Sequence, residues 1–296
     1  MKSIVFGEVL WDIYPDKSVI GGAPFNFAAH LSLLGDEVSL ITGVGRDSLG
    51  EDTITCIRKY GIGDDYIALT DKPTGSCIVT LDGNGIPKYS ITPDSAYDNI
   101  ELSGEVVEKL KRCGADLFYF NTLAQRSEVS RRTLKKLLAE LEFENIMCDL
   151  NIRPNCYDAD SIKLCLENAT IVKISSEEAH FLTDTGAVKN TVRPIYESLR
   201  EEYPNIKLLV YTMGADGSAV YDYVNGETHF SGKPEEINVV STVGAGDCYG
   251  ASFVHYYMAG ISIEEAIHLA TKRSNIVVSH TEAIPPCLEG IKGSAF

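Results

Sequence analysis

The sequence predicts an α/β fold in which helices cover both faces of a mainly parallel central sheet, in three layers, with a small β-sheet lid beside it. Apolar runs of strand length alternate with segments of helical period along most of the chain, which is typical of parallel βαβ units. Residues 13–20 and 74–95 break this alternation and have the pattern of β-ribbons, the second with a hairpin loop at residues 82–85. We therefore expect one α/β domain over residues 1–296 that carries a lid.

The predicted elements of the body follow in chain order. Strands are expected at residues 4–7, 38–42, 117–120, 146–150, 171–174 and 208–212, and helices at residues 24–34, 49–60, 128–142, 162–167 and 192–203. Pro24 suits the first turn of its helix, and Gly35 suits the position just past its end. In that helix Phe27, Leu31 and Leu34 share one face, which leaves Asn26 on another.

Composition excludes several classes of protein. The chain has 26 Lys and Arg against 42 Asp and Glu, a formal charge of −16, which disfavours nucleic acid as a partner. The chain enters a strand at once and has no apolar run of 18 residues, so we expect neither a secretory signal nor a membrane partner. The eight cysteines form no C-x-x-C pair, which is typical of packed thiols in a reduced, cytoplasmic protein.

The most informative stretch runs from residue 241 to residue 253. Gly244, Ala245 and Gly246 leave the backbone uncovered just before a run with helical spacing, where free N–H groups would bind an anion. Asp247 follows directly, where a carboxylate can accept a proton from an attacking hydroxyl. An anion site beside a base is what phosphoryl transfer to an alcohol requires. The other interpretation, equally open from this segment alone, is that Asp247 complements the helix dipole.

A second group of candidates lies near the start of the chain. Gly21 and Gly22 form a turn that lets a ligand approach the backbone, and the amide of Asn26 can both donate to and accept from a polyol. A tight turn with an incidental Asn explains the same pattern. Glu8 and Asp12 follow the first strand, at the end where open α/β sheets place ligands. Asp12 is either a ligand of vicinal hydroxyls or a solvated loop carboxylate.

Polar residues also follow three later strands. Asp149, Asn151 and Arg153 would point to one side if strand alternation continued, as a ligand cluster or as a structural Asp–Arg pair. Residues 212–217 form a hairpin-like turn that could border an adenine nucleotide. Glu178 opens a helix, where it could orient metal-bound water or simply serve as a first-turn acid.

Two of these motifs, in this order, resemble a known family. Gly21-Gly22-Ala23-x-x-Asn26 and Gly244-Ala245-Gly246-Asp247 are similar to the two signatures of ribokinase-like sugar kinases of the PfkB type, and the likeness spans nearly the whole chain, including the lid. The nucleotide and metal-water segments of the family resemble Thr212-x-Gly214-x-x-Gly217 and Ser175-x-x-Glu178. Within the family, fructokinases are the most similar, through Gly7-Glu8-Val9-Leu10-Trp11-Asp12 and Asp149-x-Asn151-x-Arg153-Pro154.

The resemblance implies a three-layer ribokinase-like fold and MgATP-dependent phosphorylation of a sugar hydroxyl, with Asp247 as the base. The implied anion site consists of Gly244, Ala245 and Gly246, and the implied sugar ligands are Asp12, Gly21, Gly22, Asn26 and Arg153. The implied nucleotide contacts are Thr212, Gly214, Gly217 and Ser175, with Glu178 acting on Mg²⁺ through water. The family commonly has Asp where this chain has Ser241, which leaves activation by K⁺ open, and Asn where it has Ser175.

Fructose is the expected acceptor, and ribose, a nucleoside or a 2-keto-3-deoxy sugar acid are alternatives. Trp11 and Tyr14 could stack on a base or cover a sugar ring. A non-catalytic sugar sensor is disfavoured by the complete set at residues 244–247, and a dinucleotide oxidoreductase by the wrong glycine spacing after residues 43–45. The exposed edge of the predicted lid also indicates a homodimer joined through the lids.

Overall fold

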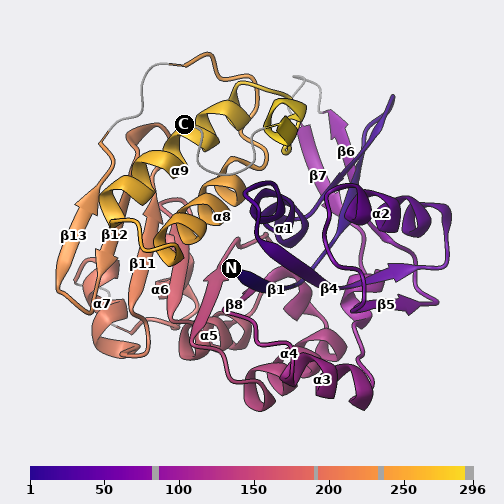
Figure 1. The fold of residues 1–296 in the computed structure, drawn as a ribbon, viewed down its shortest axis with the longest axis horizontal. Helices are drawn as coiled ribbons and strands as arrows, with labels where there is room; N and C mark the ends of the chain where they lie inside the picture. The colour runs from indigo at the N-terminus through magenta and orange to yellow at the C-terminus, as the bar shows by residue number, and fades with distance from the viewer. Residues whose placement is uncertain (82–86, 190–192, 233–236, 291–296) are drawn as a thin grey trace.

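The computed structural model describes residues 1–81, 87–189, 193–232 and 237–290, and within them a large sheet lies between two layers of helices (Figure 1). Its nine strands have the order β13-β12-β11-β10-β9-β8-β1-β4-β5. The strands from β5 to β11 are parallel, whereas β12 and β13 are antiparallel. Their bounds are β1 Lys2–Phe6, β4 Glu37–Gly45, β5 Ile67–Thr70, β8 Leu117–Asn121, β9 Asn145–Asp149, β10 Ile171–Ser175, β11 Leu208–Thr212, β12 Ser218–Asp222 and β13 Glu227–Phe230. The predicted mainly parallel sheet is confirmed.

The helices of the described residues divide between the two faces of this sheet. One face carries α1 Ala23–Leu33, α2 Ser48–Lys59, α8 Ala245–Met258 and α9 Ile263–Val278. The other carries α3 Gly104–Lys111, α4 Glu128–Glu140, α5 Ala159–Asn168, α6 Ala179–Asp184 and α7 Ile195–Glu202. Side chains of β8 alternate between the two cores, with Leu117 and Tyr119 toward α1 and with Phe118 and Phe120 toward the opposite layer. Tyr119 stacks on Phe27 of α1 with ring centroids 3.8 Å apart, and the three predicted layers are confirmed.

A smaller sheet occupies the segments predicted as a lid. It has the order β3-β2-β6-β7, with β2 parallel to β6 and the other pairs antiparallel. The bounds are β2 Leu10–Ile13, β3 Ser18–Gly21, β6 Gly75–Leu81 and β7 Pro87–Ile91. This sheet begins at Leu10, before the predicted residue 13, because β2 follows the loop after β1 directly. The hairpin loop predicted at residues 82–85 lies outside the described residues.

The observed elements correct the sequence prediction in two respects. The prediction that strand alternation continues through Asp149, Asn151 and Arg153 is wrong. The strand β9 ends at Asp149, and Asn151 has a φ of 40°, so a loop determines where the side chains of Asn151 and Arg153 lie. The strands β5 and β13 and the helices α3 and α9 are additional elements that the sequence analysis did not predict. Among the helices of the described ranges, none is long and apolar enough to span a bilayer.

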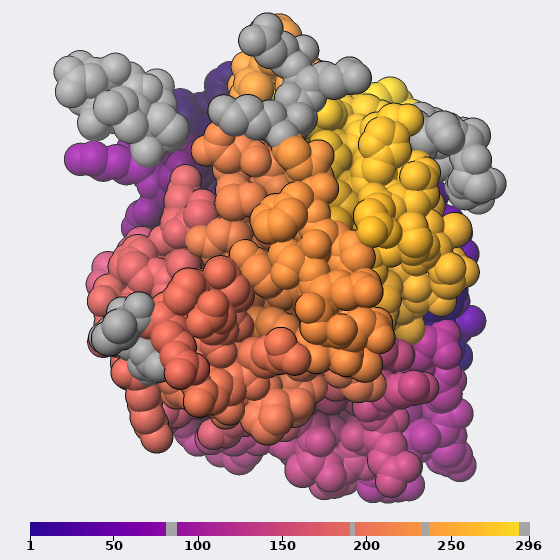
Figure 2. All heavy atoms as spheres, turned by 90° about the vertical axis from the view of Figure 1, so that its left-hand side faces the viewer, coloured from indigo at the N-terminus to yellow at the C-terminus, as the bar shows by residue number. Residues whose placement is uncertain are grey.

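The strand β13 forms one edge of the large sheet. Figure 2 looks toward this edge and shows residues of β11 to β13 (orange) beside α9 (yellow). His229 of β13 and Glu264 of α9 form a hydrogen bond of 2.7 Å through Nδ1 and Oε1. This contact ties α9, which packs on α8, to the far edge of the sheet.

Candidate active site

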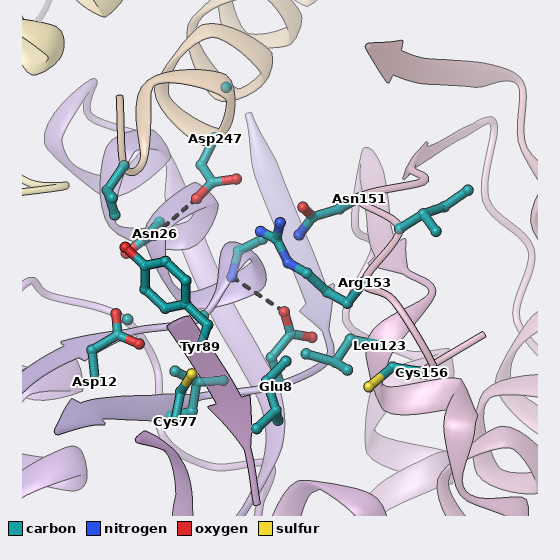
Figure 3. A pocket seen from close by; sticks show the side chains of 18 of the residues that line it. Glu8, Asp12, Asn26, Cys77, Tyr89, Leu123, Asn151, Arg153, Cys156 and Asp247 are labelled. Carbon is teal, nitrogen blue, oxygen red and sulfur yellow. Dashed lines mark hydrogen bonds between the residues drawn. The ribbon is translucent and has the colours of Figure 1, made fainter. Parts of the chain in front are cut away.

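A cavity of about 1560 Å³ lies at the carboxyl ends of the parallel strands, beneath the small sheet (Figure 3). Open α/β sheets place their ligands at this end. The candidate residues of the sequence analysis that line it are Glu8, Asp12, Tyr14, Gly21, Gly22, Asn26, Asp149, Asn151, Arg153, Ser175, Glu178, Thr212, Ser241, Gly244, Gly246 and Asp247. Candidates from distant parts of the chain therefore meet at one site. Ala245, Gly214 and Gly217 are not part of its lining.

The start of α8 presents open backbone N–H groups to this cavity. Gly244 precedes the helix with a φ of 76°, and a Cβ at this position would lie 2.4 Å from the Cβ of Ala283. The N–H of Ala245 bonds back to the carbonyl of Thr242 at 3.3 Å. The N–H groups of Gly246 and Asp247 have no acceptor among the described residues, as expected for the first turn of a helix. The N–H of Gly244 likewise has no acceptor among the described residues, so within the predicted set at residues 244–246 only the N–H of Ala245 is already hydrogen-bonded.

Asp247 is held by a residue from the other end of the chain. Asn26 Nδ2 donates to Asp247 Oδ2 at 2.8 Å, the dashed contact between the two labelled side chains in Figure 3. Burial raises the pKa of Asp247 above its usual value, and the hydrogen bond from Asn26 and the charges of Lys173 and Arg153 oppose this rise. The two signatures thus meet in a single hydrogen bond, which fixes the carboxylate of Asp247 at the start of α8.

Glu8 is a buried carboxyl that lines the same cavity and supports the start of α1. Its Oε1 accepts hydrogen bonds from Ala23 N at 3.2 Å and from Asn121 Nδ2 at 2.9 Å, whereas Oε2 has no partner among the described residues. Burial raises the pKa of Glu8 to about 7. A Cβ at Gly22, whose φ is 102°, would lie 2.7 Å from the Glu8 carbonyl oxygen, so this close approach requires glycine.

The small sheet provides the facing wall of the cavity. Asp12 lies within β2, so the alternative of a loop carboxylate is wrong, and Figure 3 shows it beside Tyr89 of β7. Both residues line the cavity, as does Tyr14. Trp11 points elsewhere, because its Nε1 donates to Thr53 Oγ1 of α2 at 2.9 Å. Tyr89 and Phe181 are aromatic lining residues that the sequence analysis missed, and for Tyr89 its place next to a loop outside any βαβ unit gave little signal.

Ser175 and Glu178 form one compact unit on the opposite wall. Glu178 Oε2 accepts from Ser175 N at 2.8 Å and from Ser175 Oγ at 2.7 Å, and Oε1 accepts from Ile152 N at 2.6 Å. Thr212, the last residue of β11, lies on the same wall. Gly217, which does not line the cavity, is required by close packing in the turn before β12, because a Cβ there would lie 2.0 Å from the carbonyl oxygen of Gly232.

An ion pair in the wall of the cavity was not predicted from the sequence. Lys173 Nζ donates to Asp149 Oδ2 at 2.7 Å, and both side chains are almost fully buried. A lysine inside an apolar strand is itself a signal, because buried charges are rare unless they are paired. Arg153 is exposed to the cavity, and its guanidinium has no hydrogen-bonded partner among the described residues. No group of three His, Cys, Asp or Glu side chains in the described ranges could hold a metal ion.

Comparison with known proteins identifies the family. The sequence profile described as pfkB family carbohydrate kinase matches residues 15–289. The chain belongs to this family. Carbohydrate kinases are phosphotransferases with an alcohol group as acceptor, so the coarse activity follows from membership. The probable fructokinase-5 of Arabidopsis thaliana is 26% identical to this pfkB kinase over 277 residues, which cover 85% of the chain and 81% of the relative.

Solved structures share the fold of this pfkB kinase. A PfkB family carbohydrate kinase from Listeria grayi DSM 20601 matches with a TM-score of 0.81 and 17% identity, over 98% of both chains. The fructokinase of Vibrio cholerae O395, solved with fructose, ADP and calcium, matches with a TM-score of 0.78 and 20% identity, over 95% of this chain and 94% of that one. The chain therefore has the ribokinase-like α/β fold that its two signatures predicted.

Proposed function

We propose that this protein transfers the γ-phosphoryl group of MgATP to a hydroxyl of a sugar, with D-fructose as the preferred acceptor. The observation that carries this proposal is the position of Asp247, beside the open amides of α8 and 2.8 Å from Asn26. A positioned base next to an anion site is the pair that phosphoryl transfer to an alcohol needs. The similarity to fructokinases supports the choice of acceptor.

Asp247 acts as the general base in the proposed reaction. Its Oδ2 accepts from Asn26, which leaves Oδ1 to accept the proton of the sugar hydroxyl. As the proton moves to Asp247, the hydroxyl oxygen forms its bond to the γ-phosphorus and the bond to ADP breaks. The N–H groups of Gly246 and Asp247 stabilise the charge on the transferring group. A positioned base typically contributes about 10²–10⁴-fold in rate.

We propose that ATP binds along the wall of Ser175 and Thr212, with the turn of Gly214 and Gly217 at its border. Magnesium fits this wall, because the carboxylate of Glu178 lines the cavity and Mg²⁺ prefers oxygen ligands. Backbone N–H groups hold both oxygens of Glu178, so it would act through metal-bound water. When bound, the ion neutralises charge on the phosphates. The Ser241 hydroxyl accepts a hydrogen bond from Val243 N at 3.2 Å. Activation by K⁺ is tested by comparing turnover in K⁺ with turnover in a large organic cation.

The charge of the cavity supports a neutral polyol as the acceptor. Glu8, Asp12 and Asp247 place three carboxyl groups on its walls. Asp12 can accept two hydrogen bonds from vicinal hydroxyls, and Tyr89 can cover the ring of a sugar. A 2-keto-3-deoxy sugar acid would bring a carboxylate to Arg153, and a nucleoside would bring a base to Tyr89, so both belong in the test together with ribose.

The experiment measures ADP release with fructose, ribose, 2-keto-3-deoxygluconate, a nucleoside and no acceptor. We expect the fastest turnover with fructose and a loss of at least about 10²-fold in Asp247→Asn with an unchanged melting temperature. Asp160→Asn is the matched control, because Asp160 is a first-turn acid of α5 outside the cavity. Wild-type turnover in Asp247→Asn would overturn the base assignment. Faster turnover of another acceptor would replace fructose, and sugar binding without ADP release would favour a sensor.

We also propose that the protein is a homodimer joined through its small sheets. The strands β3 and β7 are edges of that sheet, which a second copy can cover. Ile78 of β6 is 43% exposed and adjoins Cys77, which faces the cavity, so Ile78 lies on the outer face of the sheet. An apolar side chain on the outer face of a sheet is best buried against a partner.

A reducing cytoplasm is the location that we propose for the protein. All eight cysteines are free thiols in the structure. Four of them, Cys77, Cys148, Cys165 and Cys248, are buried within the fold. Free buried thiols of this kind are typical of proteins that fold under reducing conditions.

A further inference from the structure

A lysine lies in the middle of the central sheet, where the neighbouring residues are apolar. Lys173 is part of β10, between Val172 and Ile174, and is 5% exposed. Its partner Asp149 is 2% exposed and lies opposite it in the parallel register of β9 and β10. Burying an ammonium group is strongly unfavourable unless its charge is compensated. The placement of this cation therefore calls for a physical reason.

The side chain of Lys173 lies along a face of α8 that consists of glycine. A Cβ at Gly250 would lie 3.2 Å from Lys173 Cδ, and a Cβ at Gly246 would lie 3.4 Å from Lys173 Nζ. Gly246 and Gly250 are four residues apart and share one face of the helix. The lysine chain thus extends toward the first turn of α8, and its ammonium group ends beside the residue that precedes Asp247.

This position is unfavourable for a cation unless negative charge is also present. The N-terminus of a helix carries a partial positive charge, which repels a second positive group. Asp149 compensates the charge of Lys173 at 2.7 Å, but it does not by itself explain why the ammonium group lies at the start of α8. The carboxylate of Asp247 and, in the proposed reaction, the phosphoryl group are the negative charges that favour this arrangement.

We propose that Lys173 is a positioning residue of the transfer site, whose buried ammonium group, held by Asp149 beneath the first turn of α8, keeps Asp247 as a carboxylate. This inference rests on the proposed function, in which Asp247 is the base. The pKa of Asp247 is raised by burial and lowered by Asn26, Lys173 and Arg153, which agrees with the geometry. Burial disfavours the charge of Lys173, but Asp149 and Glu178 outweigh it, so the pKa of Lys173 is raised and the group stays protonated.

Other groups also face Asp247 and must be considered in its titration. They are Glu8 after β1, Tyr119 of β8, Asp149 at the end of β9, Arg153 in the following loop, Lys173 of β10 and Cys248 of α8. Glu8 and Asp149 are the acidic members, and each disfavours a second carboxylate. Changes at Lys173 and at Asp149 should therefore move the titration of Asp247 in opposite directions.

The experiment measures kcat/KM for the sugar against pH at saturating MgATP. Activity is present when Asp247 is ionised and is lost as pH falls, so the acidic limb reports its pKa. We expect Lys173→Met to move this limb upward by about one pH unit or more, with activity recovering toward wild type at high pH. In Lys173→Arg the acidic limb should stay close to its wild-type pH. In Asp149→Asn the acidic limb should move to lower pH, and this variant alone tests the proposal if Lys173→Met does not fold.

The matched control is Arg131→Met, which breaks an ion pair of the same length, 2.7 Å, between Arg131 and Asp158 outside the cavity. We expect it to lower the melting temperature without moving the acidic limb. An equal loss of activity at all pH values in Lys173→Met, or the same direction of shift in Asp149→Asn, would show a merely structural pair. Carboxyl ¹³C NMR titration of Asp247, identified by its absence in Asp247→Asn, separates the two proposals, because it needs no turnover. An unchanged Asp247 titration in Lys173→Met overturns the role of Lys173 even if the kinase activity is confirmed.

Discussion

Asn26 and Asp247, which are 221 residues apart, join the starts of α1 and α8 through a hydrogen bond of 2.8 Å between Nδ2 and Oδ2. Asn26 is buried inside a helix whose described side chains are nearly all buried, so the rest of α1 fixes its position. The donor can rotate little, and it holds one carboxylate oxygen of Asp247 while the other remains available. The orientation of the base thus depends on the packing of α1.

Asn26→Ala should lower kcat/KM for the sugar by about 10–100-fold, because it removes a hydrogen bond to a charged group. The same hydrogen bond lowers the pKa of Asp247, so the acidic limb of the pH profile should move upward. Asn168→Ala is the control, since Asn168 donates only to the Leu164 carbonyl of its own helix, at 2.8 Å. A normal pH profile in Asn26→Ala would mean that the contact does not act on the base.

Glu8→Gln should change how stability depends on pH. The pKa of Glu8 is raised by burial from 4.5 to about 7, so its contribution to stability is full below pH 4.5 and is lost as pH rises toward 7. At about 1.4 kcal/mol per pKa unit, the loss is about 3 kcal/mol. Gln keeps the acceptor for Ala23 and Asn121 without the charge. The free energy of unfolding, measured with urea at pH 5 and pH 8, should fall less between the two pH values in Glu8→Gln than in wild type. An equal change in both proteins would contradict the burial argument.

Gly244→Ala and Gly260→Ala compare two glycines with left-handed backbone that flank α8. Their φ angles are 76° and 82°, so alanine costs about 1–2 kcal/mol at either position. At Gly260 the added Cβ meets no described atom within 4 Å, whereas at Gly244 it would lie 2.4 Å from Ala283 Cβ. We expect Gly244→Ala to lose a further 1–3 kcal/mol or so in unfolding free energy and most of its turnover. Equal stability of the two variants would show that the loop at Ala283 moves freely.

Arg126→Met should loosen the connection between the small sheet and the body. Arg126 holds Asp98 through two hydrogen bonds of 2.8 and 2.7 Å and donates to the carbonyl of Thr92, just after β7, at 2.7 Å. Asp98 is 2% exposed, so its charge would be left uncompensated at a cost of about 3–5 kcal/mol. We expect a higher KM for the sugar together with lower stability, measured by kinetics and by calorimetry.

The exposed pair of Arg132 and Glu101 provides the control for this change. The pair has a distance of 3.2 Å, and its side chains are 63% and 70% exposed. Breaking it by Arg132→Met should cost less than about 1 kcal/mol. If Arg132→Met raised KM as much as Arg126→Met did, the effect could not be assigned to the small sheet.

Ile78→Asp tests the proposed dimer. Because Ile78 lies on the outer face of the small sheet, the charge should separate the two copies without entering the cavity. Sedimentation at micromolar concentration should give a dimer for wild type and a monomer for the variant. A wild-type monomer under these conditions would refute the dimer, and an unchanged dimer in Ile78→Asp would place its interface elsewhere.

The sequence predicted the body of the fold well because its strands and helices have strong periodic patterns. The resemblance of residues 21–26 and residues 244–247 to the two family signatures implied that both serve one site, and Asn26 and Asp247 do meet in a hydrogen bond. The sequence could not predict contacts that depend on tertiary placement. The pair of Lys173 and Asp149 needs the register of β9 and β10, and the loop position of Arg153 depends on where β9 ends.

The side chains on the small sheet show the same limit. From the residues alone, Asp12 was either a sugar ligand or a loop carboxylate, and Trp11 was, like Tyr14, a candidate to stack on a base or cover a sugar ring. Alternation along β2 directs the side chains of Asp12 and Trp11 to opposite faces, so Asp12 faces the cavity and Trp11 bonds to Thr53 of α2. One residue of register determines which of the two is a ligand, and the sequence did not indicate where β2 begins.

Trp11 is the only tryptophan of the chain, and its hydrogen bond to Thr53 connects the small sheet to α2. Excitation near 295 nm therefore reports on this junction alone. Any movement of the sheet relative to the body changes the indole's surroundings and its emission. The protein thus carries its own optical reporter of this junction, one residue away from Asp12, and stopped-flow mixing with sugar or nucleotide tests whether the junction changes on binding, without an attached dye.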